Sequence, residues 1–210
     1  MQMTTERLLL LLTLVPILLL SLTLHELAHG YVAYRLGDPT AKRMGRLSLN
    51  PSRHLDPIGT AMFFITFLFS SFVFGWAKPV PVSPYYFKNR QKGMALVGIA
   101  GPATNFVVAI AFILALNGLR FEFMSFPFRL FLLVFQVNVI LGIFNLIPVP
   151  PLDGSRVLGA FLPKEAYEKW VALDRYGMFI AIGVLMVVIW SGILGWALAG
   201  LTELFLTNYF

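Results

Sequence analysis

The stretch "LTLHELAHGYVAY", residues 22–34, places His25, Glu26 and His29 at the end of an apolar run that begins at about Leu8. On a helix, residues i and i+4 lie on one face, so the two imidazoles can bind one metal ion from the same side. Glu26 is rotated by about 100° from His25 and can reach a metal-bound water without being a ligand. The pattern is typical of a zinc hydrolase, in which the metal lowers the pKa of a bound water to about 7 and the glutamate removes its proton.

The same motif has alternative explanations, because it also arises by chance as a polar patch for helix packing or as a haem or other cofactor site. The apolar surroundings favour the metal. Each ionisable group at the centre of a bilayer costs roughly 2.5 kcal/mol or more on insertion scales. A metal ion compensates both imidazoles at once, so it is the best single explanation for a glutamate and two histidines within five residues.

The composition indicates a membrane protein. Of the 210 residues, 58% are hydrophobic and 12% are charged, whereas a soluble domain is closer to half apolar and a quarter charged. The absence of cysteine excludes disulfides and thiolate metal sites. The net charge of +6 comes from loops between apolar runs, and no basic run alternates with aromatics. This pattern predicts membrane topology and no nucleic-acid partner.

Apolar stretches near or above the ~20 residues needed to cross the hydrocarbon core predict the fold class. We expect an all-α, multi-pass protein of the cell membrane, in contact with the lipid bilayer, with about four to six transmembrane helices. The last stretch is long enough to tilt, kink or break in two near Ser191, Gly192 and Gly195. The stretches are Leu8 to about Leu36, Ile58 to about Trp76, Met94 to Leu119, Phe128 to about Pro148, and Tyr176 to about Leu206.

Lysine and arginine predict the orientation, because cytoplasmic loops carry an excess of them. Segments 35–57, 77–92 and 150–175 are rich in these residues and should be cytoplasmic. This assignment puts both ends of the stretch 58–76 on one side. We therefore expect a re-entrant β element there, because "GWAKPVPVSPYY" has the prolines of an extended edge strand. The alternative is an ordinary transmembrane span, in which case the basic segment 77–92 would lie outside and would be an exception to the excess of Lys and Arg in cytoplasmic loops.

A catalytic zinc site needs a third protein ligand beside the two histidines. His54 is the only other histidine, and most acids lie in loops, where a solvated surface charge is the default interpretation. Asp153 differs, because the prolines of "FNLIPVPPLDGSRVL" must break the fourth apolar stretch and free backbone groups there. An acid at this break is well placed to meet His25 and His29. The acids considered are Asp38, Asp56, Glu122, Asp153, Glu165, Glu168, Asp174 and Glu203.

Three motifs together resemble the site-2 protease family of intramembrane zinc metalloproteases, in its compact prokaryotic-type branch. They are "HELAH", "AGPATN" and "FNLIPVPPLDG". The resemblance implies one Zn²⁺ per chain, held by His25, His29 and Asp153, with Glu26 as general base. It also implies hydrolysis of peptide bonds within or near transmembrane segments of membrane-protein substrates, with the active site toward the cytoplasmic side.

Other polar residues are weaker candidates for contacts with the substrate or the transition state. Asn105 and Asn138 lie on apolar helices, where interhelical hydrogen bonding is the default role. Asn145 belongs to the third motif, and by the resemblance it orients substrate backbone or the tetrahedral intermediate. For His54 a contact near the cleft mouth competes with a purely folded loop, and the loop is favoured. Gly101 is assigned to helix packing.

We expect residues 1–210 to form a single integral-membrane metalloprotease domain with a core at 8–160 and one or two extra helices at 176–206. Few polar residues join the third and fourth apolar stretches, so no PDZ or other soluble domain is expected. Two other functions compete with proteolysis: a non-catalytic membrane scaffold and a metal transporter. Glu26 argues against the first, and the absence of a sequence repeat argues against the second.

Overall fold

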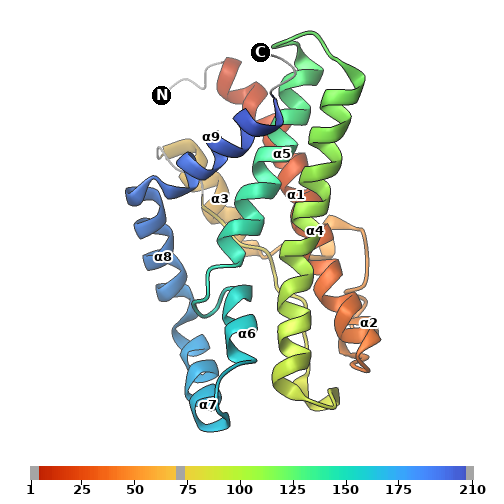
Figure 1. Ribbon diagram of the computed structural model, residues 1–210, viewed down its shortest axis with the longest axis vertical. Coiled ribbons are helices and arrows are strands. Elements are labelled where there is room, and N and C mark those ends of the chain that lie inside the picture. The colour runs from red at the N-terminus through yellow and green to blue at the C-terminus, as the bar shows by residue number, and fades with distance from the viewer. Residues whose placement is uncertain (1–4, 70–73, 207–210) are drawn as a thin grey trace.

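The computed structural model describes residues 5–69 and 74–206, and these are mostly helical, without a β-strand among them (Figure 1). Four helical segments are long and apolar enough to cross a membrane. The prediction of a multi-pass α-helical membrane protein is therefore confirmed. The segments belong to α1 (Thr5–Arg35), α4 (Arg90–Leu119), α5 (Phe126–Asn145) and the run Lys164–Ser191, which joins α7 (Lys164–Ala172), η3 (Leu173–Tyr176) and α8 (Gly177–Ser191).

Side-chain caps and prolines set the ends of the central helices. Asn89 accepts a hydrogen bond from the Lys92 amide at the start of α4, and Ser125 accepts one from the Phe128 amide at the start of α5. Each cap satisfies a backbone N–H that has no partner within the helix. At its other end, α5 stops at Asn145, shortly before the first proline of the third motif. The helices therefore begin and end where the local sequence requires it.

Helix α4 is the centre of the bundle, and it packs against α5, α1 and the short helix α6 (Asp153–Gly159). Its C-terminal half contributes Ala109, Ile113 and Leu116 to a core shared with Phe128 and Phe135 of α5. Hydrocarbon provides little hydrophobic drive between helices, so this close packing is a principal source of their association. One helix thus contacts α1, α5 and α6, which carry most of the candidate site residues.

The last apolar stretch breaks at Gly192, one of the positions where the sequence allowed a break. Helix α8 ends at Ser191, and α9 (Ile193–Phe205) begins after Gly192, whose φ is +66°. Glycine adopts this left-handed conformation without a Cβ penalty. The chain therefore changes direction here, and α9 then runs against α5.

The predicted β element between the first two core helices is wrong. Helix α3 (Pro57–Phe69) has 13 residues and spans only about 20 Å, less than the hydrocarbon core. The described chain then lies back along α3, since the Phe74 amide donates to Thr66 Oγ1 at 2.9 Å. Within the described residues, β pairing is limited to one isolated bridge between Leu55 and Ala77. Residues 70–73 of the predicted stretch lie outside the described part of the chain.

The proline-rich segment, residues 78–84 ("KPVPVSP"), cannot form a regular ladder because proline has no N–H to donate. Buried charged side chains hold its backbone instead. Arg46 donates to the Lys78 carbonyl at 2.6 Å, and the Ser83 amide donates to Asp38 at 2.6 Å. Asp38 also accepts from Thr40 and is fully buried, so its interpretation as a solvated surface charge is wrong.

We expect Asp38→Ala to lower the free energy of unfolding by about 2 kcal/mol, because partly buried donors on Thr40 and Ser83 lose a charged, buried acceptor. Unfolding in detergent and limited tryptic proteolysis at Lys88, which follows this segment, measure the effect. Asp38→Asn keeps one acceptor oxygen and should fall between Asp38→Ala and the unmodified protein. Unchanged stability and protease resistance in Asp38→Ala would contradict the anchoring role.

Candidate metal centre

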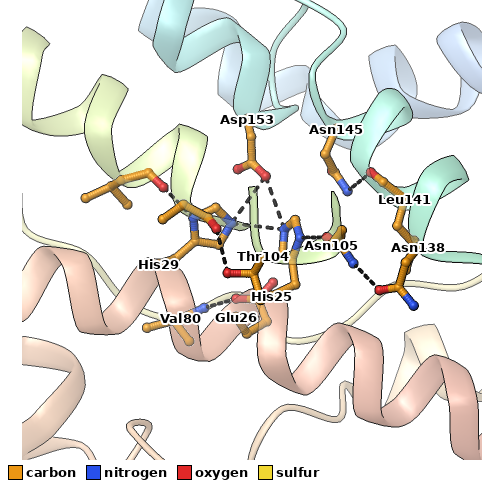
Figure 2. A network of polar contacts seen from close by, with 12 residues as sticks. His25, Glu26, His29, Val80, Thr104, Asn105, Asn138, Leu141, Asn145 and Asp153 are labelled. Carbon is orange, nitrogen blue, oxygen red and sulfur yellow. Dashed lines mark hydrogen bonds and ion pairs between the residues drawn. The ribbon is translucent and has the colours of Figure 1, made fainter. Parts of the chain in front are cut away.

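His25, His29 and Asp153 meet between α1 and α6 (Figure 2). The two Nε2 atoms are 3.0 Å apart, and they lie 3.1 and 3.2 Å from Asp153 Oδ2. Tetrahedral zinc, with bonds of about 2.0–2.1 Å to nitrogen, separates its ligand atoms by about 3.3 Å. The three atoms therefore lie close to the spacing that one zinc ion requires.

The other imidazole nitrogens show which atoms carry protons. His25 Nδ1 lies 2.5 Å from Asn105 Oδ1, and His29 Nδ1 lies 2.6 Å from the Val97 carbonyl oxygen. These oxygens only accept, so each Nδ1 donates, and a neutral ring then has its lone pair on Nε2, the atom that faces Asp153. Asp153 Oδ2 is buried and receives no hydrogen bond. Three facing lone pairs are unfavourable without a cation, so this donor set fits zinc.

Among the described residues, no other group of three His, Cys, Asp or Glu side chains brings its ligand atoms together in this way. The three members come from distant parts of the sequence, since the histidines lie on α1 and Asp153 is the first residue of α6. The structure thus assembles the three residues that the sequence analysis assigned to one site.

Glycines on α4 allow the centre to form. A Cβ atom at Gly101 would lie 2.4 Å from His29 Nε2 and 2.6 Å from His25 Nε2. At Gly98, one turn earlier, it would lie 2.8 Å from the Asp153 carbonyl oxygen. From the sequence, Gly101 was expected to permit close helix packing or a kink. Its position in "AGPATN" was the available signal, but the contact with the imidazoles appears only in three dimensions.

Helix α6 presents Asp153 because both of its ends are held. At its start, a Cβ on Gly154 would lie 2.1 Å from the Leu146 carbonyl oxygen, so only glycine permits this approach to the end of α5. At its end, Gln91 of α4 donates to the carbonyls of Gly159 and Leu162 at 3.0 and 2.8 Å. A carboxylate on a seven-residue helix thereby gains a fixed position.

Glu26 lies beside the three ligand candidates and outside their group. Its Oε2 accepts a hydrogen bond of 2.8 Å from the Val80 amide in the proline-rich segment. The side chain borders a cavity of about 340 Å³ that His25, His29 and Asp153 also line. This is the relation that the helical spacing predicts for a residue that reaches a water and does not bind the metal.

The remaining candidates occupy three different places. Asn145 lines the same cavity, and its Nδ2 donates to the Leu141 carbonyl at 2.9 Å. Asn105 is buried behind His25 and also bonds Asn138, which the sequence analysis had considered only for helix contacts. His54 lies in the loop before α3, where its Nε2 is 2.9 Å from the Ser48 carbonyl oxygen. The structure therefore brings Asn105 and Asn145 to the centre and leaves His54 apart from it.

A His–His–Asp cluster within a bundle of helices long and apolar enough to cross a membrane is the arrangement expected of a membrane-embedded metalloenzyme. A family model described as Peptidase family M50 matches residues 123–190. YwhC of Bacillus subtilis, named as a candidate zinc metalloprotease, is 42% identical over 181 residues, which cover 83% of this chain and 80% of the relative. The chain therefore belongs to Peptidase family M50 and is a zinc metalloprotease, which confirms the resemblance to the site-2 protease family.

More distant relatives agree with this assignment. Rip2 of Mycolicibacterium smegmatis, also named as a candidate zinc metalloprotease, is 30% identical over 177 residues, covering 80% of this chain and 64% of the relative. Zinc metalloprotease MJ0392 of Methanocaldococcus jannaschii is 29% identical over 149 residues, covering 71% of this chain and 34% of the relative. No solved structure matches the chain significantly.

We expect Gly101→Ala to weaken zinc binding by about tenfold or more, because the added methyl group overlaps both Nε2 atoms. Gly118→Ala is the matched control on the same helix, since nothing lies within 4 Å of its Cβ position. Competition with a chelator measures zinc affinity, and thermal unfolding checks the fold. Equal zinc affinity in the two variants would contradict the close approach of α4 to the imidazoles.

Proposed function

We propose that this protein hydrolyses peptide bonds within or next to the transmembrane segments of membrane-protein substrates. In this proposal His25, His29 and Asp153 hold a single Zn²⁺, and Glu26 is the general base. The observation that carries it is the convergence of two imidazoles and a buried carboxylate beside Glu26 and a cavity. These residues all fall within the proposed core of residues 8–160.

The depth of the centre supports cleavage inside the membrane. Arg35, in the last turn of α1, lies ten residues after His25. At 1.5 Å per residue this places His25 about 15 Å from that end, near the middle of a hydrocarbon core of about 30 Å. A peptide bond must therefore reach the level of the membrane interior to be cut, and the substrate must expose its backbone there.

The proposed chemistry divides between the metal and Glu26. A zinc ion held by His25, His29 and Asp153 would be a Lewis acid, able to polarise the scissile carbonyl and to lower the pKa of water to near neutral pH. Glu26 takes the proton from the attacking water and delivers it to the leaving amine. The Val80 amide holds Oε2 of this carboxylate, which orients the side chain at the wall of the cavity. In this proposal Asn145, which lines the same cavity, donates to the substrate carbonyl oxygen or to the developing oxyanion.

The proposed orientation puts the centre toward the cytoplasmic side. Helix α2 (Thr40–Arg43), helices α6 and α7 and the start of α4 lie at one end of the bundle, and the loop between α4 and α5 lies at the other (Figure 1). The basic segments 35–57, 77–92 and 150–175 all belong to the first end. The positive-inside rule then places that end in the cytoplasm.

Replacing Glu26 separates catalysis from metal binding. We expect Glu26→Gln to retain zinc and to cleave a model transmembrane substrate at least about 100-fold more slowly, because the general base is lost. Asp153→Ala should lose both zinc and cleavage, whereas His54→Ala, at a histidine outside the cluster, should retain zinc. Metal analysis and cleavage assays on purified protein measure these outcomes. Full activity in Glu26→Gln would contradict its role as general base, and a full zinc complement in Asp153→Ala would contradict its role as ligand.

The absence of cysteine allows a direct test of orientation. Single cysteines at Lys164 and Glu122, both exposed, report on opposite ends of the bundle. In intact cells, a membrane-impermeant maleimide should label Glu122→Cys, which we place outside, and should reach Lys164→Cys only after lysis. The reverse labelling pattern would place the centre toward the outside.

A further inference from the structure

A chain of hydrogen bonds runs from His25 through three helices (Figure 2). His25 Nδ1 faces Asn105 Oδ1 at 2.5 Å, and Asn105 Nδ2 donates to Asn138 Oδ1 at 2.9 Å. Asn138 Nδ2 then donates to Ser21 Oγ and to the Val134 carbonyl oxygen, each at 2.9 Å. Asn105 and Asn138 are 1% and 0% exposed, so water does not compete for these bonds.

The last hydrogen bond of this series, to Val134, determines which way both amide groups point. The Val134 carbonyl oxygen can only accept a hydrogen bond. Asn138 must therefore turn its NH₂ group toward this oxygen and its own side-chain oxygen toward Asn105. Asn105 must then use its NH₂ group on Asn138 and present its oxygen to His25. If Asn105 turned over, its oxygen would face the oxygen of Asn138, and its NH₂ group would face the N–H of His25.

The two histidines differ in the group that accepts the hydrogen bond from Nδ1. His29 uses the backbone carbonyl of Val97, which the turn of α4 already holds in one direction. His25 uses a side-chain amide, whose oxygen and nitrogen can exchange places by rotation. A reversed amide would favour the tautomer with hydrogen on Nε2, and that hydrogen would occupy the space between His25, His29 and Asp153. A second amide is therefore needed behind the first.

We propose that Asn105 and Asn138 are positioning residues that hold His25 as the Nδ1–H tautomer and thereby set the zinc affinity of the centre. This inference rests on the proposed role of His25 as a ligand. Partners of metal-binding histidines fix the tautomer and ring orientation, and their loss typically weakens metal binding by about 10–100-fold. Asn138 contacts no ligand candidate directly, so its effect must pass through Asn105.

Zinc affinity is the first measurement, made on the full chain by chelator competition without substrate. Asn105→Leu should weaken binding by about 10–100-fold, and Asn138→Leu by about tenfold. Asn105→Asp offers only acceptor oxygens to His25, so it should bind zinc at least about ten times more tightly than Asn105→Leu. Thr104→Ala, which removes a neighbouring hydroxyl outside the chain of bonds, should match the unmodified protein.

The tautomer itself is the second measurement. The protein has three histidines, so nitrogen-15 labelling of histidine gives few signals, and His25→Ala assigns those of His25. In metal-free protein, His25 should carry hydrogen on Nδ1, and Asn138→Leu should raise the population with hydrogen on Nε2. Asn105→Asp should keep hydrogen on Nδ1 even when combined with Asn138→Leu. A purely structural role for these amides predicts no change of tautomer.

Three outcomes would overturn the inference: wild-type zinc affinity in Asn105→Leu, equal losses in Asn105→Asp and Asn105→Leu, or an unchanged tautomer in Asn138→Leu. If Asn105→Leu does not fold, the tautomer of His25 in Asn138→Leu tests the inference by itself. Failure of the ligand assignment is seen separately, because His25→Ala would then keep its zinc.

Discussion

The centre depends on one electrostatic constraint: three lone pairs, on two imidazoles and a carboxylate, face one another within a helical bundle. These atoms lie 3.0–3.2 Å apart, and no hydrogen stands between them when each imidazole is neutral with its proton on Nδ1. Such an arrangement is stable only around a cation, and at membrane depth water cannot disperse the charge. The surrounding helices must therefore keep the histidines in one tautomer and Asp153 at one distance.

Helix α4 satisfies these demands in two ways at once. Its backbone comes close at Gly98 and Gly101, where no side chain fits, and its Val97 carbonyl and Asn105 amide hold the two Nδ1 atoms. Small residues and polar side chains are the usual means by which membrane helices associate. Here both lie on the face of α4 that borders the metal centre, so helix packing and ligand orientation depend on the same contact.

The sequence predicts those parts of the molecule that follow from local spacing. The i, i+4 separation puts His25 and His29 on one face of α1, and apolar length predicts the spans. The pairing of Asp153 with them needed an argument from the proline break and from membrane depth. Burial of Asp38 and the contact of Gly101 with the imidazoles depend on segments far away in the chain, so local sequence does not reveal them.

The proline-rich segment differs from the predicted β element because of its missing N–H donors. Extended prolines resemble an edge strand, but Pro79 and Pro81 offer no N–H to a partner strand. The backbone is held instead by side chains from α1 and the loops after it. Val80, between the two prolines, donates its N–H to Glu26 of α1 at 2.8 Å. A regular ladder would compete for this amide. The prolines that exclude a strand therefore also leave the Val80 N–H free to orient Glu26.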